Sequence, residues 1–258
     1  MVLVGAFVLP PTVGSAPPSS QWPWEVGQEF RYVWVKGRQR VGETRWATGW
    51  VPNPGRPQEK LLEIQATRNY DHGGISQKAF GTTHLKADGT TLRFRERVSS
   101  TNANQGDKGA RQEIRFENRE QTAWTTYVHN GKEDRPIVRK HSFPQGTFLL
   151  GNQAVEHWVV LAAGLPREFE THTVVVYYPD QKRTFSVEFK KSKAQSTLKI
   201  AGRDVDATRY SFRSSDSSLK GELWIKEGRL QQLEFQAAGL KVILGKPILR
   251  KPKKASAK

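Results

Sequence analysis

Two histidines and a carboxylate form the first group whose residue types could support chemistry. His129 and His141 stand on either side of the hairpin signal Asn130-Gly131, and Asp134 lies between them. Imidazole and carboxylate groups bind zinc, so a metal site across this hairpin is one hypothesis. The alternative is a set of scattered surface histidines, which is the default in a basic protein. We adopt the alternative and predict no metal ligands.

A second group is the pair Asp204 and Asp206, which alternate along a predicted strand and therefore share one face. Paired carboxylates serve glycosidases, but only within a cleft. Arg203 and Arg209 stand beside them and favour surface ion pairing instead. The chain also lacks a Gly-x-Ser-x-Gly elbow, a Walker loop, a His-Glu-x-x-His motif and an EF-hand loop. We therefore predict a protein that is not an enzyme, with no catalytic residues and no cofactor.

A third group is basic. The chain has 41 Lys and Arg against 25 Asp and Glu, a formal net charge of +16. Such a charge favours anionic partners, although a well-solvated surface is an equal alternative. The residues that we predict to contact an anionic envelope surface alternate on one strand or lie in the basic tail: Arg93, Arg95, Arg97, Lys251, Lys253 and Lys254.

The elements that must position these residues are mostly strands. Polar and apolar residues alternate through roughly fourteen short segments, with turn signals such as Asp88-Gly89 between them. One convincing helix is predicted at residues 152–163, where Asn152 would cap its start and Gly164 would adopt a left-handed conformation after its end. Sequential hairpins indicate an antiparallel meander, and so many strands must curl or split.

We therefore predict a mainly β fold, a large curved antiparallel meander forming an open or half-barrel sheet, with one central helix packed on it. This single domain would span residues 26–245. Residues 1–16 would be a signal peptide, with a flexible apolar N-terminus as the alternative. Residues 17–25 would be a Pro/Ser linker and 246–258 a disordered basic tail. Export would place the protein in the periplasm or outside the cell, and the mature chain would have no transmembrane segment. Zero cysteines exclude disulfides.

Aromatic residues on the predicted strands and helix indicate an apolar cavity between the curved sheet and the helix. The residues predicted to bind a ligand there are Phe30, Tyr32, Trp34, Phe94, Trp124 and Trp158. A hydrophobic anion or an acyl chain would suit the basic rim. The alternative is that the same side chains close on one another as solid core.

The chain resembles a loosely defined group of uncharacterised bacterial periplasmic β-proteins with a curved sheet like that of LolA and LolB. The residues that carry this resemblance are Gly27-Gln28-x-Phe30-x-Tyr32-x-Trp34, Lys36-Gly37, Val41-Gly42, Leu223-Trp224-Ile225 and Glu227-Gly228-Arg229-Leu230. It covers about residues 26–244. In that group the sheet and a helical lid enclose an apolar ligand site, whereas this sequence has one clear helix where the lipoprotein carriers have more. The resemblance implies no catalytic residues.

Three functions remain open at this point. The first is a non-catalytic exported envelope protein that binds an apolar or lipid-like ligand on the concave face of the sheet. The second is an envelope scaffold or interaction module without a ligand. The third is a β protein that binds nucleic acid on aromatic and arginine side chains. We rank the third last, because the alternating aromatics read as core and no RNA-binding signature is present.

Overall fold

The computed structural model describes residues 22–87, 89–102, 110–119, 122–129, 137–142, 144, 146–151, 153–181, 183–194 and 196–245. Among them, the side chains of residues 102, 110, 111, 119, 122–129, 137–139, 141 and 180 lie outside the description. The predicted signal peptide, most of the linker, the basic tail and the tail residues Lys251, Lys253 and Lys254 lie outside the described residues.

The first half of the chain forms eight strands. They are β1 (Glu29–Lys36), β2 (Gln39–Asn53), β3 (Arg56–His72), β4 (Ile75–Leu85), β5 (Thr91–Asn102), β6 (Ala110–Arg119), β7 (Thr122–His129) and β8 (Ile137–Ser142). Each pairs with the next in antiparallel register. Asp88 of the predicted Asp88-Gly89 turn lies outside the description, but Gly89 has a φ of 83° between β4 and β5, as that turn requires.

The second half contains the helix and eight further strands. They are β9 (Phe148–Leu149), α1 (Val155–Gly164), β10 (Thr171–Tyr178), the 3₁₀ turn η3 (Pro179–Gln181), β11 (Arg183–Lys191), β12 (Ser196–Ile200), β13 (Arg203–Ser214), β14 (Lys220–Lys226), β15 (Arg229–Phe235) and β16 (Leu240–Leu244).

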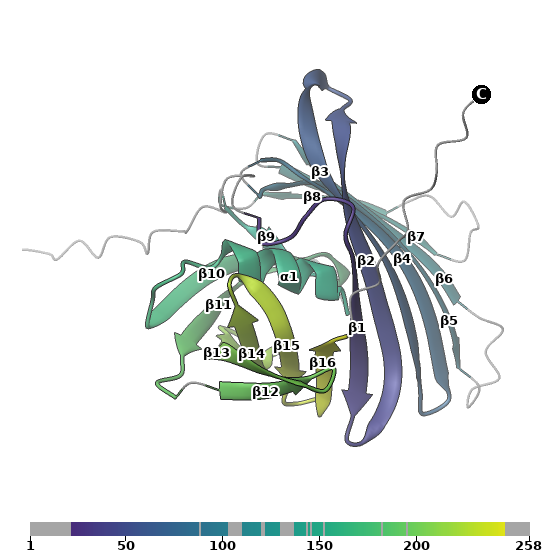
Figure 1. Ribbon diagram of the computed structural model, residues 1–258. Helices are drawn as coiled ribbons and strands as arrows, with labels where there is room; N and C mark the ends of the chain where they lie inside the picture. The colour runs from purple at the N-terminus through teal and green to yellow at the C-terminus, as the bar shows by residue number, and fades with distance from the viewer. Residues whose placement is uncertain are drawn as a thin grey trace, which may run out of the picture.

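The strands form one 16-stranded sheet in the order β8-β7-β6-β5-β4-β3-β2-β1-β16-β15-β14-β13-β11-β10-β9, with β12 paired to β13 beside this path. The mainly β fold with a large open antiparallel sheet and one helix is therefore confirmed. Three details differ from a simple meander: β1 pairs with β16, β11 pairs with β13, and β9 pairs with β10 in parallel. Figure 1 shows the tall wall of β1–β8 facing the smaller curved wall of β9–β16, with α1 between them.

Helix α1 begins later than predicted and ends differently. Its N-cap residue is Ala154, which makes no side-chain cap, and Asn152 lies outside the described residues. Gly164 is the last residue of the helix itself, and the backbone N–H of Leu165 donates to the carbonyl of Leu161 at 3.1 Å. The predicted cap and left-handed glycine were therefore wrong. Because Val155 to Ala162 are all buried, tertiary packing stabilises this helix more than local caps do.

The core lies on both sides of α1. Trp158 is 4% exposed and packs against Phe212 and Phe235, with ring centroids 4.8 and 5.5 Å away. On the first wall, Phe30 stacks on Trp46 at 4.4 Å. The helix thus closes the space between the two walls with its own side chains.

Candidate functional site

The polar side chains of α1 contact the concave face of the β1–β8 wall. The backbone N–H of Gly151 donates to Nδ1 of His157 at 2.8 Å, so we assign the ring proton to Nε2. Nε2 then donates to the hydroxyl of Thr83 on β4 at 3.1 Å. Burial, and secondarily the positive charge of Arg68, lowers the pKa of His157 from 6.5 to about 3. The neutral imidazole therefore joins the helix to the sheet.

Three charged side chains are buried next to this histidine. A guanidinium nitrogen of Arg68 on β3 donates to Glu96 on β5 and lies 3.7 Å from Oε1 of Glu156 on α1. Among the described residues, neither carboxylate oxygen of Glu156 accepts a hydrogen bond. A Cβ atom at Gly81 on β4 would lie 3.3 Å from Oε1 of Glu156, so the bare glycine backbone makes room for this carboxylate. One arginine thus holds a strand and the helix together.

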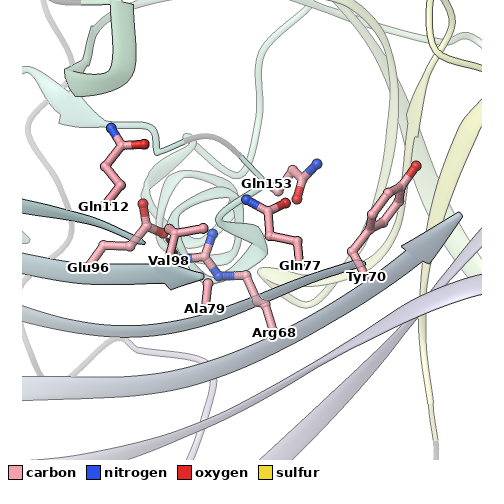
Figure 2. Close-up of a pocket in the computed structure, with 8 residues that line it drawn as sticks. All are labelled: Arg68, Tyr70, Gln77, Ala79, Glu96, Val98, Gln112 and Gln153. Atoms are coloured by element: carbon pink, nitrogen blue, oxygen red, sulfur yellow. Dashed lines mark hydrogen bonds and ion pairs between the residues drawn. The ribbon is translucent and has the colours of Figure 1, made fainter. Parts of the chain in front are cut away.

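A small cleft adjoins this cluster. Its lining residues are Arg68, Tyr70, Gln77, Ala79, Glu96, Val98, Gln112 and Gln153. Figure 2 shows Gln77 and Gln153 close to each other above the sheet, with Arg68 and Glu96 beside them. The cleft has a volume of about 50 Å³, which is room for a few water molecules. It is polar and too small for an acyl chain.

The structure places five of the six predicted ligand-binding residues in the core. Phe30, Tyr32, Trp34, Phe94 and Trp158 are all buried, and the side chain of Trp124 lies outside the description. Tyr32 donates its hydroxyl to the carbonyl of Leu230, and Trp34 donates its Nε1–H to the hydroxyl of Thr44. The polar groups of Tyr32 and Trp34 thus have hydrogen-bond partners within the protein, and all five side chains are buried by protein atoms. A ligand-binding role for these residues stays a prediction.

The outer face of the same wall is basic. Arg95, Arg97 and Arg115 surround Glu113, at 2.6, 3.4 and 2.6 Å. Burial acts to raise the pKa of Glu113, but hydrogen bonds and charges from Arg115 and Arg95 outweigh it and lower this pKa from 4.5 to about 2. Three guanidinium groups around one carboxylate leave a positive surface. The predicted outward orientation of the β5 arginines fits this arrangement.

The same arrangement recurs on β1 and β2. Arg31, Arg40 and Arg45 all pair with Glu43, and Arg31 and Arg45 stand directly opposite each other across the strands. Like charges in such positions destabilise a sheet unless another group neutralises them. Glu43 supplies one negative charge for three positive ones, so this part of the outer face is also positive.

An exposed aromatic side chain lies between the two arginine groups. Across β2 to β5, Arg45 stands opposite Thr67, Thr67 opposite Phe80, and Phe80 opposite Arg97. The Phe80 side chain is 46% exposed. It lies in an open hollow of about 770 Å³ whose lining includes Lys78, Arg97 and Ser99. An aromatic ring exposed among cations is what an anionic amphiphile would contact.

The other two chemical hypotheses, a metal site at the histidines and a catalytic pair of carboxylates, are not supported by the described residues. Backbone register places His141 opposite Ala123, six positions from His129 along β7, or roughly 20 Å at 3.3 Å per residue. A metal ion shared by these two histidines is therefore excluded. Asp206 accepts a hydrogen bond from Thr197 at 2.7 Å on the exposed β12–β13 pair. Within the described part of the chain, no group of three His, Cys, Asp or Glu residues could hold a metal ion.

The described strands form a large open antiparallel sheet, and the side chains of α1 belong to its main hydrophobic core. No protein-family model matches the chain, and no curated protein matches it. One similar solved structure is the crystal structure of a beta-barrel-like protein of domain of unknown function DUF1849 from Brucella abortus, at a TM-score of 0.51 and 10% identity over 88% of this chain and 98% of that chain. This similarity supports a large β fold of the predicted kind, whereas no match to LolA or LolB is found. Over the described part of the chain, every helix falls short of the length and apolarity that a membrane span requires.

Proposed function

We propose that the protein is an exported, non-catalytic envelope protein that attaches to an anionic, lipid-like surface through the outer face of β2–β6. The observation that carries this proposal is the exposed Phe80 ring among Lys78, Arg97 and the two arginine groups. A phenylalanine ring gains free energy when its apolar surface is buried at the boundary between headgroups and acyl chains of a lipid layer. Each nearby Lys or Arg adds about 1 kcal/mol near an acidic membrane.

The same face favours lipid over nucleic acid. Single-stranded nucleic acid is bound by several aromatic platforms in a row, each of which stacks on one base. On the described outer face of β3–β5, Phe80 is the large aromatic side chain that is exposed. A single ring with a basic surround matches an amphiphilic layer better than a chain of bases.

Vesicle sedimentation tests the attachment. The full chain should bind vesicles that contain acidic phospholipid and lose that binding at high salt. The double variant Lys78→Gln and Arg97→Gln should bind roughly thirtyfold more weakly, since two contacts of about 1 kcal/mol each are lost. Phe80→Ala should weaken binding to acidic vesicles at low salt, because the ring no longer enters the lipid layer.

The control for this experiment is Lys199→Gln, which removes an exposed charge from β12 on the other wall. It should bind like the parent chain. Equal binding to neutral and acidic vesicles would refute an electrostatic attachment. Tighter binding to single-stranded DNA than to acidic vesicles would favour the nucleic-acid alternative.

Export is a separate part of the proposal and rests on the apolar run Val2–Leu9 and the small residues before Pro17. We expect protein from the envelope fraction of the native host to begin near Pro17. N-terminal sequencing of that protein measures the cleavage site. Recovery of an intact chain starting at Met1 from the cytoplasm would contradict export.

A further inference from the structure

The β2–β3 hairpin extends beyond the rest of the wall. The last residue of β2 that pairs with β1 is Ala47, and the first residue of β3 that pairs with β4 is Leu62. Beyond these residues β2 and β3 stay paired with each other as far as Asn53 and Arg56. Figure 1 shows this hairpin rising above the neighbouring strands. Its inner flank and the β4–β5 connection border a hollow of about 810 Å³. This volume is in the range of small-molecule sites.

The floor of the hollow is apolar. Leu61 is 2% exposed, Leu92 is half-buried, and Ala87 adds a methyl group beside them. Leu61 is buried although it lies on the same face of β3 as the more exposed Glu63. A ligand in this hollow can therefore contact the apolar side chains of Leu92 and Ala87 as well as the charged side chains around them.

The rim of the hollow is basic. Arg56, Lys60, Lys86 and Arg93 line it, against the single carboxylate of Glu59. Hydrogen bonds from Arg56 at 3.0 Å and Asn53 at 3.3 Å engage that carboxylate, and Arg56 is the main reason why the pKa of Glu59 is lowered. Lys60 and Arg93 form no ion pair with any described residue. The positive charges of Lys60 and Arg93 therefore remain available to bind an anion.

From these observations we infer that the hollow between the β2–β3 hairpin and the β4–β5 connection is a binding site for a single-chain anionic amphiphile. A phosphate or carboxylate headgroup contacts Lys60, Lys86 and Arg93, and a short acyl chain lies over Leu61 and Leu92. The ligand chemistry is the one expected from the sequence, but the site is at the rim of the sheet rather than beneath the helix. This inference is independent of the attachment through Phe80.

Calorimetric titration of the full chain with octyl phosphate, octyl glucoside and inorganic phosphate tests the site. Octyl phosphate should bind with a saturable signal and more tightly than either of the others, because it alone has both the charge and the chain. Lys60→Glu with Lys86→Glu should weaken octyl phosphate binding about tenfold. Both lysines are exposed, so the variant should fold.

Two controls separate this site from the attachment face. Lys199→Glu and Phe80→Ala should leave octyl phosphate binding unchanged, whereas Phe80→Ala should weaken vesicle binding. Equal affinity for inorganic phosphate and octyl phosphate would overturn the amphiphile site in favour of a simple anion site. Unchanged binding in the Lys60 and Lys86 variant would overturn the location.

Discussion

Replacing Arg68 by methionine is expected to lower the free energy of unfolding by about 3–5 kcal/mol. Arg68, Glu96 and Glu156 are all nearly inaccessible to solvent, and Arg68 is the cation between the two carboxylates. Methionine keeps much of the side-chain volume but leaves two buried carboxylates without that charge. Urea unfolding followed by tryptophan fluorescence measures the change.

Two further variants make this result specific. Arg45→Met removes an arginine that is half exposed and pairs with Glu43 at the surface, and it should cost less than about 1 kcal/mol. Adding Glu96→Gln and Glu156→Gln to Arg68→Met should recover part of the loss, because replacing a whole buried ion cluster is often close to neutral. Equal losses for Arg68→Met and Arg45→Met would show that the buried cluster does not hold the helix.

Acid is expected to destabilise the protein through His157. In the folded chain its pKa is about 3, whereas an unfolded histidine titrates near 6.5. Below pH 6.5 the unfolded state therefore binds a proton that the folded state does not. Its contribution to stability is complete above pH 6.5 and is lost as the pH falls toward 3, by up to about 1.4 kcal/mol per pH unit.

Comparison with His157→Gln isolates this effect, because glutamine keeps a donor for Thr83 but cannot take up the proton. The variant should be less stable than the parent chain at pH 7, and it should lose less stability than the parent when the pH falls from 6.5 to 4.5. Glu113 stays ionised over this range, because its pKa is about 2. His72→Gln controls for the loss of an imidazole outside the helix interface. Parallel pH profiles for His157→Gln and the parent chain would contradict a buried neutral histidine.

Alternation along the strands was enough to predict the fold class, because a two-residue period identifies which side chains face inward. The same period contained the signal for the buried cluster. Arg68 shares a face with Ile64 and Ala66, and Glu96 interrupts the inward face of β5. That Arg68 contacts both Glu96 and Glu156 could not be predicted, because these contacts depend on the order of the strands and on which side of the helix packs against the sheet.

A helical wheel puts Glu156 and His157 on the polar side of α1, yet both are buried. A wheel assumes that one side of a helix faces solvent, and here a wall of strands covers each side. The inward residues of β4 are small, Ala79, Gly81 and Thr83, so the helix can approach closely. The large residue of that region, Phe80, then faces outward. Its exposure follows from this packing and could not be read from its neighbours in sequence.

The pairing of β1 with β16 has a consequence for how the protein folds. Tyr32 lies opposite Leu244, so the two walls are joined by strands 212 positions apart in the chain. Closing so long a loop costs entropy before any contact repays it, which slows folding. A chain that emerges N-terminus first completes β1–β8 while the open edge of β1 still lacks its partner. Until the last strand arrives, that edge can pair with other chains, so high expression should favour aggregation and binding by chaperones.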